Sequence, residues 1–190
     1  MRSSLRDAIL GKYIICSCEG HAEQAIMDLL IDGERLCFSR HDLIDGKCTQ
    51  MRIGKHIANT FLGIDTEKEV AILRILDRRN EKLVLPKEYR LWRNISVLDV
   101  ITKPEIEIIH IIAEGHYKKF KAQPHKNPLS PSEYCKANFQ QGRNRLSVKS
   151  REYVVRRYEN DLDSLVEALL EYKRLSGNSF DYCLADLLLN

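Results

Sequence analysis

The stretch YIICSCEGHAEQAIMDLL, residues 13 to 30, predicts a buried β-strand that leads directly into an amphipathic helix. Its first six residues form a short run with β-branched and aromatic side chains, which is typical of a buried strand. The apolar residues that follow recur at helical spacing, at Ala22, Ala25, Ile26, Leu29 and Leu30. Glu19 and Gly20 are therefore expected at the turn between strand and helix.

The position of Glu19 makes it a candidate binding residue. Ligands of open α/β sheets gather at the carboxyl ends of the strands, and a glycine lets the backbone turn or be approached closely there. An alternative is that Glu19 and Glu23 only occupy the first turn of the helix, where the helix dipole favours negative charge.

Further strands are expected along the first two thirds of the chain. Apolar or β-branched runs predict them at residues 35 to 38, 70 to 77, 83 to 85 and 96 to 101. Residues 50 to 63 fit an amphipathic helix or an irregular one. Strands that alternate with helices indicate an α/β fold with a mainly parallel sheet.

The last third of the chain is expected to be helical. Thr102 and Glu105 form a capping-box pattern at the start of one predicted helix, and SPSE at residues 130 to 133 forms a second. Residues 161 to 175 carry a leucine-rich stripe at helical spacing. His110 falls on the apolar helix after Thr102, where a partly buried, hydrogen-bonded histidine is common, although His110 or His116 could instead serve as a general base.

The composition indicates a soluble globular chain, one domain with an appendage. Of the 190 residues, 44% are hydrophobic and 30% are charged. No apolar run approaches the roughly 18 residues of a membrane span, and residues 1 to 13 lack a signal core, so we expect a cytoplasmic protein without membrane contact. The six cysteines form no C-x-x-C pair, which predicts free, mostly buried thiols rather than disulfides or zinc ligands.

Basic residues concentrate between positions 118 and 157, where eleven Lys or Arg face two Glu. Such a segment attracts nucleic acid through its phosphates, and its aromatic side chains could stack on unpaired bases. A solvated helical face or a surface for an acidic protein partner are the alternatives. The candidate nucleic-acid contacts in this segment are Arg143, Arg145, Lys149, Arg151, Arg156 and Arg157.

Acidic residues follow three of the predicted strands. Glu19 ends the first, Asp77 ends the strand at residues 70 to 77, and Glu105 and Glu107 begin the helix after residues 96 to 101. In a parallel sheet these side chains emerge at one edge, where clustered carboxylates need a cation to offset their repulsion. Carboxylate oxygens suit Mg²⁺ or Mn²⁺, which can assist phosphodiester hydrolysis.

Three motifs together resemble the Toprim fold, specifically the compact Toprim-like proteins of bacterial phage-defence and restriction systems known as the RloB type. The motifs are IICSCEGHAEQAI at residues 14 to 26, ILRILD at 72 to 77 and ITKPEIEIIHII at 101 to 112. The resemblance implies a Toprim-like α/β domain at residues 1 to 125. Residues 126 to 190 would form a helical extension, first basic and then acidic, packed on that domain.

The resemblance also implies a divalent cation held between a first glutamate, here Glu19, and an Asp-x-Asp pair. Asp77 matches the first aspartate of the pair, whereas Arg79 stands in place of the second. Either Glu81, Glu105 or Glu107 completes the site, or an arginine has replaced the cation and cleavage is lost. A phage-defence role and a chromosome-maintenance-like ATPase partner are further implications of the resemblance.

The leading hypothesis is an Mg²⁺- or Mn²⁺-dependent nuclease acting on DNA or RNA. Its metal ligands would be Glu19, Asp77 and Glu107, while His21 or Glu105 would complete the catalytic set. Arg78 and Arg79 would bind substrate phosphate together with the basic segment. The alternatives are a non-catalytic module that binds nucleic acid or the ATPase, and a structural subunit that forms homo-oligomers through the helix at residues 161 to 175.

Overall fold

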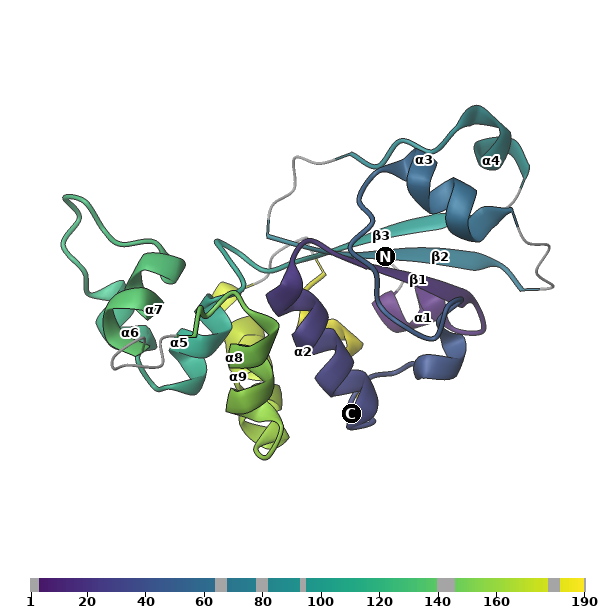
Figure 1. Cartoon of the computed structure of the whole chain (residues 1–190). Coiled ribbons are helices and arrows are strands. Elements are labelled where there is room, and N and C mark those ends of the chain that lie inside the picture. Colours follow the sequence, from purple (N-terminus) through teal and green to yellow (C-terminus); the bar gives the residue numbers. More distant parts are fainter. Residues whose placement is uncertain are drawn as a thin grey trace.

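A three-stranded parallel β-sheet forms the centre of the protein in the computed structural model, which describes residues 4–63, 68–77, 82–92, 95–139, 146–177 and 182–189 (Figure 1). Strands β1 (Tyr13–Cys18), β2 (Val70–Leu76) and β3 (Ser96–Ile101) are hydrogen-bonded in that order. All seven residues of the central strand β2 are buried, as expected for a parallel strand covered on both faces. Its one charged residue, Arg74, forms an ion pair of 3.3 Å with Asp99 on β3.

Short helices surround the sheet. In chain order the helical elements are α1 (Leu5–Ile9), α2 (His21–Asp32), η1 (Arg40–Asp42), α3 (Gly54–Ile57), the π-helical turn η2 (Ala58–Leu62), α4 (Lys87–Trp92), α5 (Ile108–Ala113), α6 (Tyr117–Lys121), α7 (Pro131–Phe139), α8 (Arg151–Tyr158), α9 (Leu162–Ser176) and η3 (Leu184–Leu187).

The two faces of the sheet support two hydrophobic cores. Alternate residues of a strand point to opposite faces, so Ile15 packs into a smaller core with α3 and η2, whereas Cys16 and Cys18 enter the larger core beneath α2. In Figure 1, α3 and α4 lie on one side of the sheet and α2, α8 and α9 on the other. Helix α8 packs against α2, and α9 packs against α5.

The predictions for β1, β2 and β3 are confirmed, including their parallel pairing. The strand expected at residues 35 to 38 is wrong, because Leu36 forms only an isolated antiparallel bridge with Leu188. Cys37 N–H donates to the Leu187 carbonyl in the same stretch, and the Arg6 guanidinium donates to the carbonyl of Leu188. Residues 83 to 85 form no strand either; Leu85 is instead buried in the smaller core.

The helix expected from Thr102 begins only at Ile108, and the capping box proposed for it is wrong. The Thr102 side chain is buried, and its hydroxyl has no hydrogen-bond partner among the described residues. The carboxylate of Glu105 caps a different helix, because it accepts a hydrogen bond of 2.9 Å from Ser132 N–H at the start of α7. Gly115, at φ 69°, then separates α5 from α6.

The other two helix starts are confirmed. Ser130 and Glu133 form a reciprocal capping box at α7. Ser130 N–H donates to the Glu133 carboxylate at 2.8 Å, and Glu133 N–H donates to the Ser130 hydroxyl at 3.4 Å. Asp161 accepts from Ser164 N–H and caps α9. On the stripe of α9, Leu165 and Leu169 are buried, whereas Leu170 is half exposed.

The predicted boundary between residues 125 and 126 stays a prediction, although the larger core draws side chains from both sides of it. All six cysteines are free, and all but Cys37 are buried. Among the described residues, no helix combines the length and the apolar character needed to cross a membrane.

Candidate functional site

A hollow of about 380 Å³ lies where β1 and β2 end. Pairing of Cys18 with Ile75 brings Glu19 and Asp77 to the same edge of the sheet, as the sequence predicts. The hollow is lined by Glu19, Gly20, His21, Ala22, Glu23, Asp77, Glu105, Ile106, Glu107 and Lys149. All four predicted acidic residues, Glu19, Asp77, Glu105 and Glu107, therefore line the hollow. Glu23 and Lys149 line it as well.

Glu19 links the ends of the two strands. One carboxylate oxygen accepts a hydrogen bond of 3.0 Å from Asp77 N–H, and the other lies 3.3 Å from the Arg52 guanidinium. Glu19 precedes α2, whose N-cap is Gly20. Its side chain is 14% exposed. Glu19 therefore faces the hollow from the sheet edge rather than serving in the first turn of the helix.

Glu23 lies in the first turn of α2, and its carboxylate lies beside Gly20. Burial raises the pKa of the Glu23 carboxyl, and the negative charges of Glu107, Glu19 and Asp77 raise it further. A Cβ atom on Gly20 would lie 3.0 Å from a Glu23 carboxylate oxygen, so the glycine leaves room for this side chain. Glu23 is therefore a residue of the site and not only a negative charge in the first turn of the helix.

Glu107 is the most deeply buried acid of the hollow. Its side chain is 1% exposed, and neither carboxylate oxygen accepts a hydrogen bond within the described part of the chain. Lys149 Nζ lies 3.6 Å from one oxygen, which is too long for a hydrogen bond. Burial raises the pKa of Glu107 although this ammonium opposes the shift. A buried carboxylate without hydrogen bonds is costly unless it is protonated or a cation compensates it.

The carboxylate oxygens of the hollow lie farther apart than the ligand atoms that bind one small metal ion directly. Among the described residues, the only three potential metal-binding side chains with donor atoms within 4.8 Å of one another are Cys16, Cys18 and Cys48. A cation in the hollow would therefore bind one or two carboxylates directly and reach the others through water, which is the usual arrangement for Mg²⁺. The carboxylate-rich donor set fits such a hard cation.

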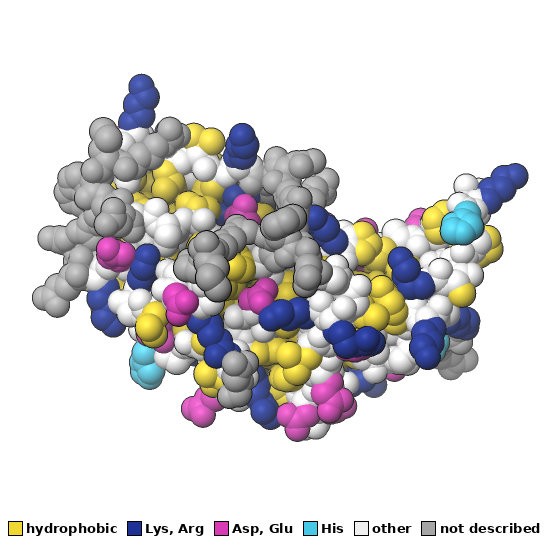
Figure 2. All heavy atoms as spheres, turned by 180° about the vertical axis from the view of Figure 1, so that it is seen from behind, with side chains coloured by type: hydrophobic (Ala, Val, Ile, Leu, Met, Phe, Trp, Pro, Cys, Tyr) yellow, Lys and Arg dark blue, Asp and Glu magenta, His cyan; other side chains and the backbone are white. Residues whose placement is uncertain are grey.

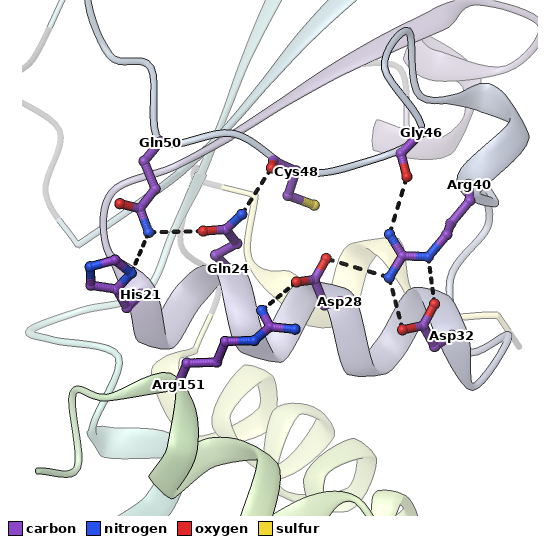
Figure 3. Close-up of polar contacts among 9 residues, drawn as sticks. All are labelled: His21, Gln24, Asp28, Asp32, Arg40, Gly46, Cys48, Gln50 and Arg151. Carbon is purple, nitrogen blue, oxygen red and sulfur yellow. Dashed lines mark hydrogen bonds and ion pairs between the residues drawn. The ribbon is translucent and has the colours of Figure 1, made fainter.

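His21 borders the hollow at the start of α2, and a chain of hydrogen bonds orients its ring (Figure 3). The Gln50 side-chain amide donates to His21 Nδ1 and to the Gln24 carbonyl oxygen, both at 2.8 Å. The Gln24 amide in turn donates to the Cys48 carbonyl at 2.9 Å. Because Nδ1 accepts a hydrogen bond, the proton of the neutral imidazole resides on Nε2.

Of the basic candidates that the structure describes, only Lys149 lines the hollow. Arg151 pairs with Asp28 at 2.6 Å and Arg157 with Glu114 at 2.5 Å, whereas Arg156 is exposed. Arg78, Arg79, Arg143 and Arg145 lie outside the described residues. In Figure 2 Lys and Arg side chains are spread over the visible face and are also present at the end that holds α6 and α7. Helix α6 contributes Lys118, Lys119 and Lys121.

Three residues at or near the hollow were not foreseen in these roles: Glu23, Gln50 and Arg52. Glu23 carried a usable signal, because it lies in the first turn of the helix that begins directly after Glu19 and Gly20, at a strand end where ligands gather. Gln50 and Arg52 belong to residues 50 to 63, where the expected helix begins only at Gly54, so both lie in the loop before it. Comparisons of the chain with protein-family models, with curated proteins and with solved structures find no match.

Proposed function

We propose that the hollow binds Mg²⁺ or Mn²⁺ and that the protein is a metal-dependent nuclease that hydrolyses phosphodiester bonds of DNA or RNA. The observation that carries this proposal is Glu107, a buried carboxylate without hydrogen bonds among the described residues that faces Glu19, Glu23 and Asp77. If position 107 served only the stability of the fold, an apolar or hydrogen-bonded side chain would be expected at that position.

Each lining residue has a role in this proposal. Glu19, Asp77 and Glu107 would hold the cation, which supplies positive charge next to the phosphate when it is bound. Lys149, 3.6 Å from Glu107, would contact a phosphate oxygen. His21 offers Nε2–H as a hydrogen-bond donor to a phosphate oxygen, and Glu23, whose pKa is raised, can accept or release a proton. Glu105 already accepts the α7 hydrogen bond, so its role would be to position α7 beside the hollow.

A role in anti-phage defence, with nucleic acid and an ATPase as partners, follows from the resemblance to RloB-type Toprim-like proteins. This part of the proposal can be tested by measuring phage plating on cells that express the wild-type chain or its Glu107→Gln variant. Protection by the wild type alone would support it, and equal plating on both would contradict it.

A second candidate function is a non-catalytic module that binds nucleic acid or a protein partner. The ion pair of Arg52 with Glu19 favours it, because a guanidinium already offsets the charge of the first expected metal ligand. In that case the acids of the hollow would bind no cation, and the lysine-bearing end at α6 would provide the binding surface.

Calorimetric titration of Mn²⁺ distinguishes the two functions. We expect the wild type to bind one Mn²⁺ and Glu107→Gln to bind at least tenfold more weakly. In chelator, the same substitution should raise the melting temperature, because it removes a buried charge. Glu171→Gln, an exposed acid paired with Arg174 on α9, is the matched control and should bind like wild type.

Cleavage of single- and double-stranded DNA and RNA, with and without chelator, completes the test. Metal-dependent cleavage that Glu107→Gln abolishes supports the nuclease. Mn²⁺ binding that is equal in wild type and Glu107→Gln would refute the site, and absent binding together with absent cleavage would leave the non-catalytic module as the function.

A further inference from the structure

A cluster of three thiols lies in the larger core, next to the hollow but separate from it. Cys16 and Cys18 come from β1, and Cys48 comes from the loop after η1. Their sulfur atoms all lie within 4.8 Å of one another, and the three residues are 1%, 0% and 2% exposed. Nothing in the proposed nuclease mechanism uses these thiols.

The backbone holds the three thiols together. Alternate positions in a strand share a face, so Cys16 and Cys18 both point toward α2. The loop runs parallel to β1 at this point: Cys18 N–H donates to the Thr49 carbonyl, and Thr49 N–H donates to the Cys16 carbonyl, both at 2.8 Å. Cys48 therefore enters the core beside the two strand cysteines with little freedom to move away.

We propose that Cys16, Cys18 and Cys48 form a three-thiolate site for one thiophilic d¹⁰ cation. Thiolate sulfur selects such soft ions over Mg²⁺ or Mn²⁺. A metal–sulfur distance of roughly 2.3 Å places three sulfurs of a trigonal site about 4 Å apart, which is compatible with the observed cluster. Within the described part of the chain no fourth potential ligand joins the three sulfurs, so Cu⁺, which accepts three ligands, fits better than Zn²⁺, which needs a fourth.

Occupation of this site would stiffen the loop that borders the hollow. Figure 3 shows that α2 holds the same loop from outside: Gln24 contacts Cys48, and Arg40 bridges Asp28, Asp32 and the Gly46 carbonyl. Farther along the loop, Gln50 orients His21. A cation at the thiols would thus fix the loop from its inner side. The inference is independent of the nuclease proposal, because it concerns different ligands and a different class of ion.

Anaerobic titration of the full chain with Cu⁺, in competition with a Cu⁺ chelator and followed by sulfur-to-copper charge-transfer absorbance, tests the site. We expect one Cu⁺ per chain, a higher melting temperature on loading, and at least tenfold weaker binding in Cys48→Ser. Cys183→Ser, which removes a buried thiol outside the cluster, should bind like wild type.

A parallel titration with Zn²⁺ identifies the ion. Zn²⁺ binding that requires Cys48 while Cu⁺ does not bind supports the site and assigns it to zinc. Stoichiometric binding of neither ion, or binding that Cys48→Ser leaves unchanged, overturns the proposal. If Cys48→Ser does not fold, X-ray absorption of copper-loaded wild type decides: three sulfur neighbours support the site, and nitrogen or oxygen neighbours refute it.

Discussion

Replacing His110 should remove a large part of the acid sensitivity of the fold. His110 is fully buried on α5, where its Nδ1 lies 2.8 Å from the Tyr158 hydroxyl on α8 and its ring stacks on that tyrosine. It does not line the hollow, so the buried, hydrogen-bonded role foreseen for it is the one the structure displays. Burial, with a contribution from Arg157, lowers the pKa of His110 from 6.5 to about 4.

The size and direction of the effect follow from these two values. Below pH 6.5 the unfolded chain binds a proton at His110, whereas the folded chain binds one only near pH 4. The free energy of unfolding is therefore highest above pH 6.5 and falls as the pH drops toward 4. A pKa lowered by about 2.5, at 1.36 kcal/mol for each pKa unit, corresponds to a loss of ~3 kcal/mol across this range.

Urea unfolding followed by far-ultraviolet circular dichroism, at several pH values between 7.5 and 4, measures the effect. His110→Gln keeps a polar partner for Tyr158 but cannot titrate, so it should lose ~3 kcal/mol less than wild type over that interval. Carboxylates that titrate in both proteins cancel in the difference. His41→Gln, at an exposed position on η1, is the control and should follow wild type. Parallel curves for wild type and His110→Gln would refute the reasoning.

Three further predictions address the hollow, the packing and the basic segment. Arg52→Ala should strengthen Mn²⁺ binding several-fold in calorimetry, because it removes a cation paired with Glu19; weaker binding would show that Arg52 supports the site. Gly54→Ala should lower the free energy of unfolding, measured with urea, by about 1–3 kcal/mol, because the new methyl group would collide with the Val84 carbonyl oxygen. An unchanged urea midpoint would contradict this close approach. In fluorescence anisotropy with labelled oligonucleotides, Arg156→Gln should weaken binding and lower the slope of log K against log salt by about one. Arg157→Gln breaks an internal ion pair and should mainly lower the free energy of unfolding. Weaker oligonucleotide binding in Arg157→Gln than in Arg156→Gln would contradict the assignment.

The sheet and its acidic edge could be predicted because they depend on local signals. The apolar runs in β1, β2 and β3 are long enough to indicate strands, although only Val100 and Ile101 of β3 are buried, and parallel pairing of β1 with β2 then brings Glu19 and Asp77 together. The caps at Ser130 and Asp161 are equally local, since each side chain bonds a backbone group three residues away.

The missed features depend on contacts between distant parts of the chain. Thr102 and Glu105 have the spacing of a capping box, yet the Glu105 carboxylate bonds Ser132, 27 residues away. The pairing of the Cys48 loop with β1 leaves no periodic pattern, because the hydrogen bonds of Thr49 with Cys16 and Cys18 join backbone atoms. Residues 35 to 38 have strand composition, but their isolated β-bridge is formed with Leu188, a partner that no local pattern reveals.

The contact of residues 35 to 37 with residues 187 to 189 has a consequence during protein synthesis. Leu36 bridges Leu188, and Arg6 donates to the carbonyl of the same leucine, so the partner of these early segments is synthesised roughly 150 to 180 residues later. At about 5–20 residues per second, that delay lasts on the order of ten to forty seconds. During this time the apolar undersides of α1 and α2 remain open to other nascent chains. Slower initiation or growth at reduced temperature should therefore increase the yield of folded protein more than a stronger promoter does.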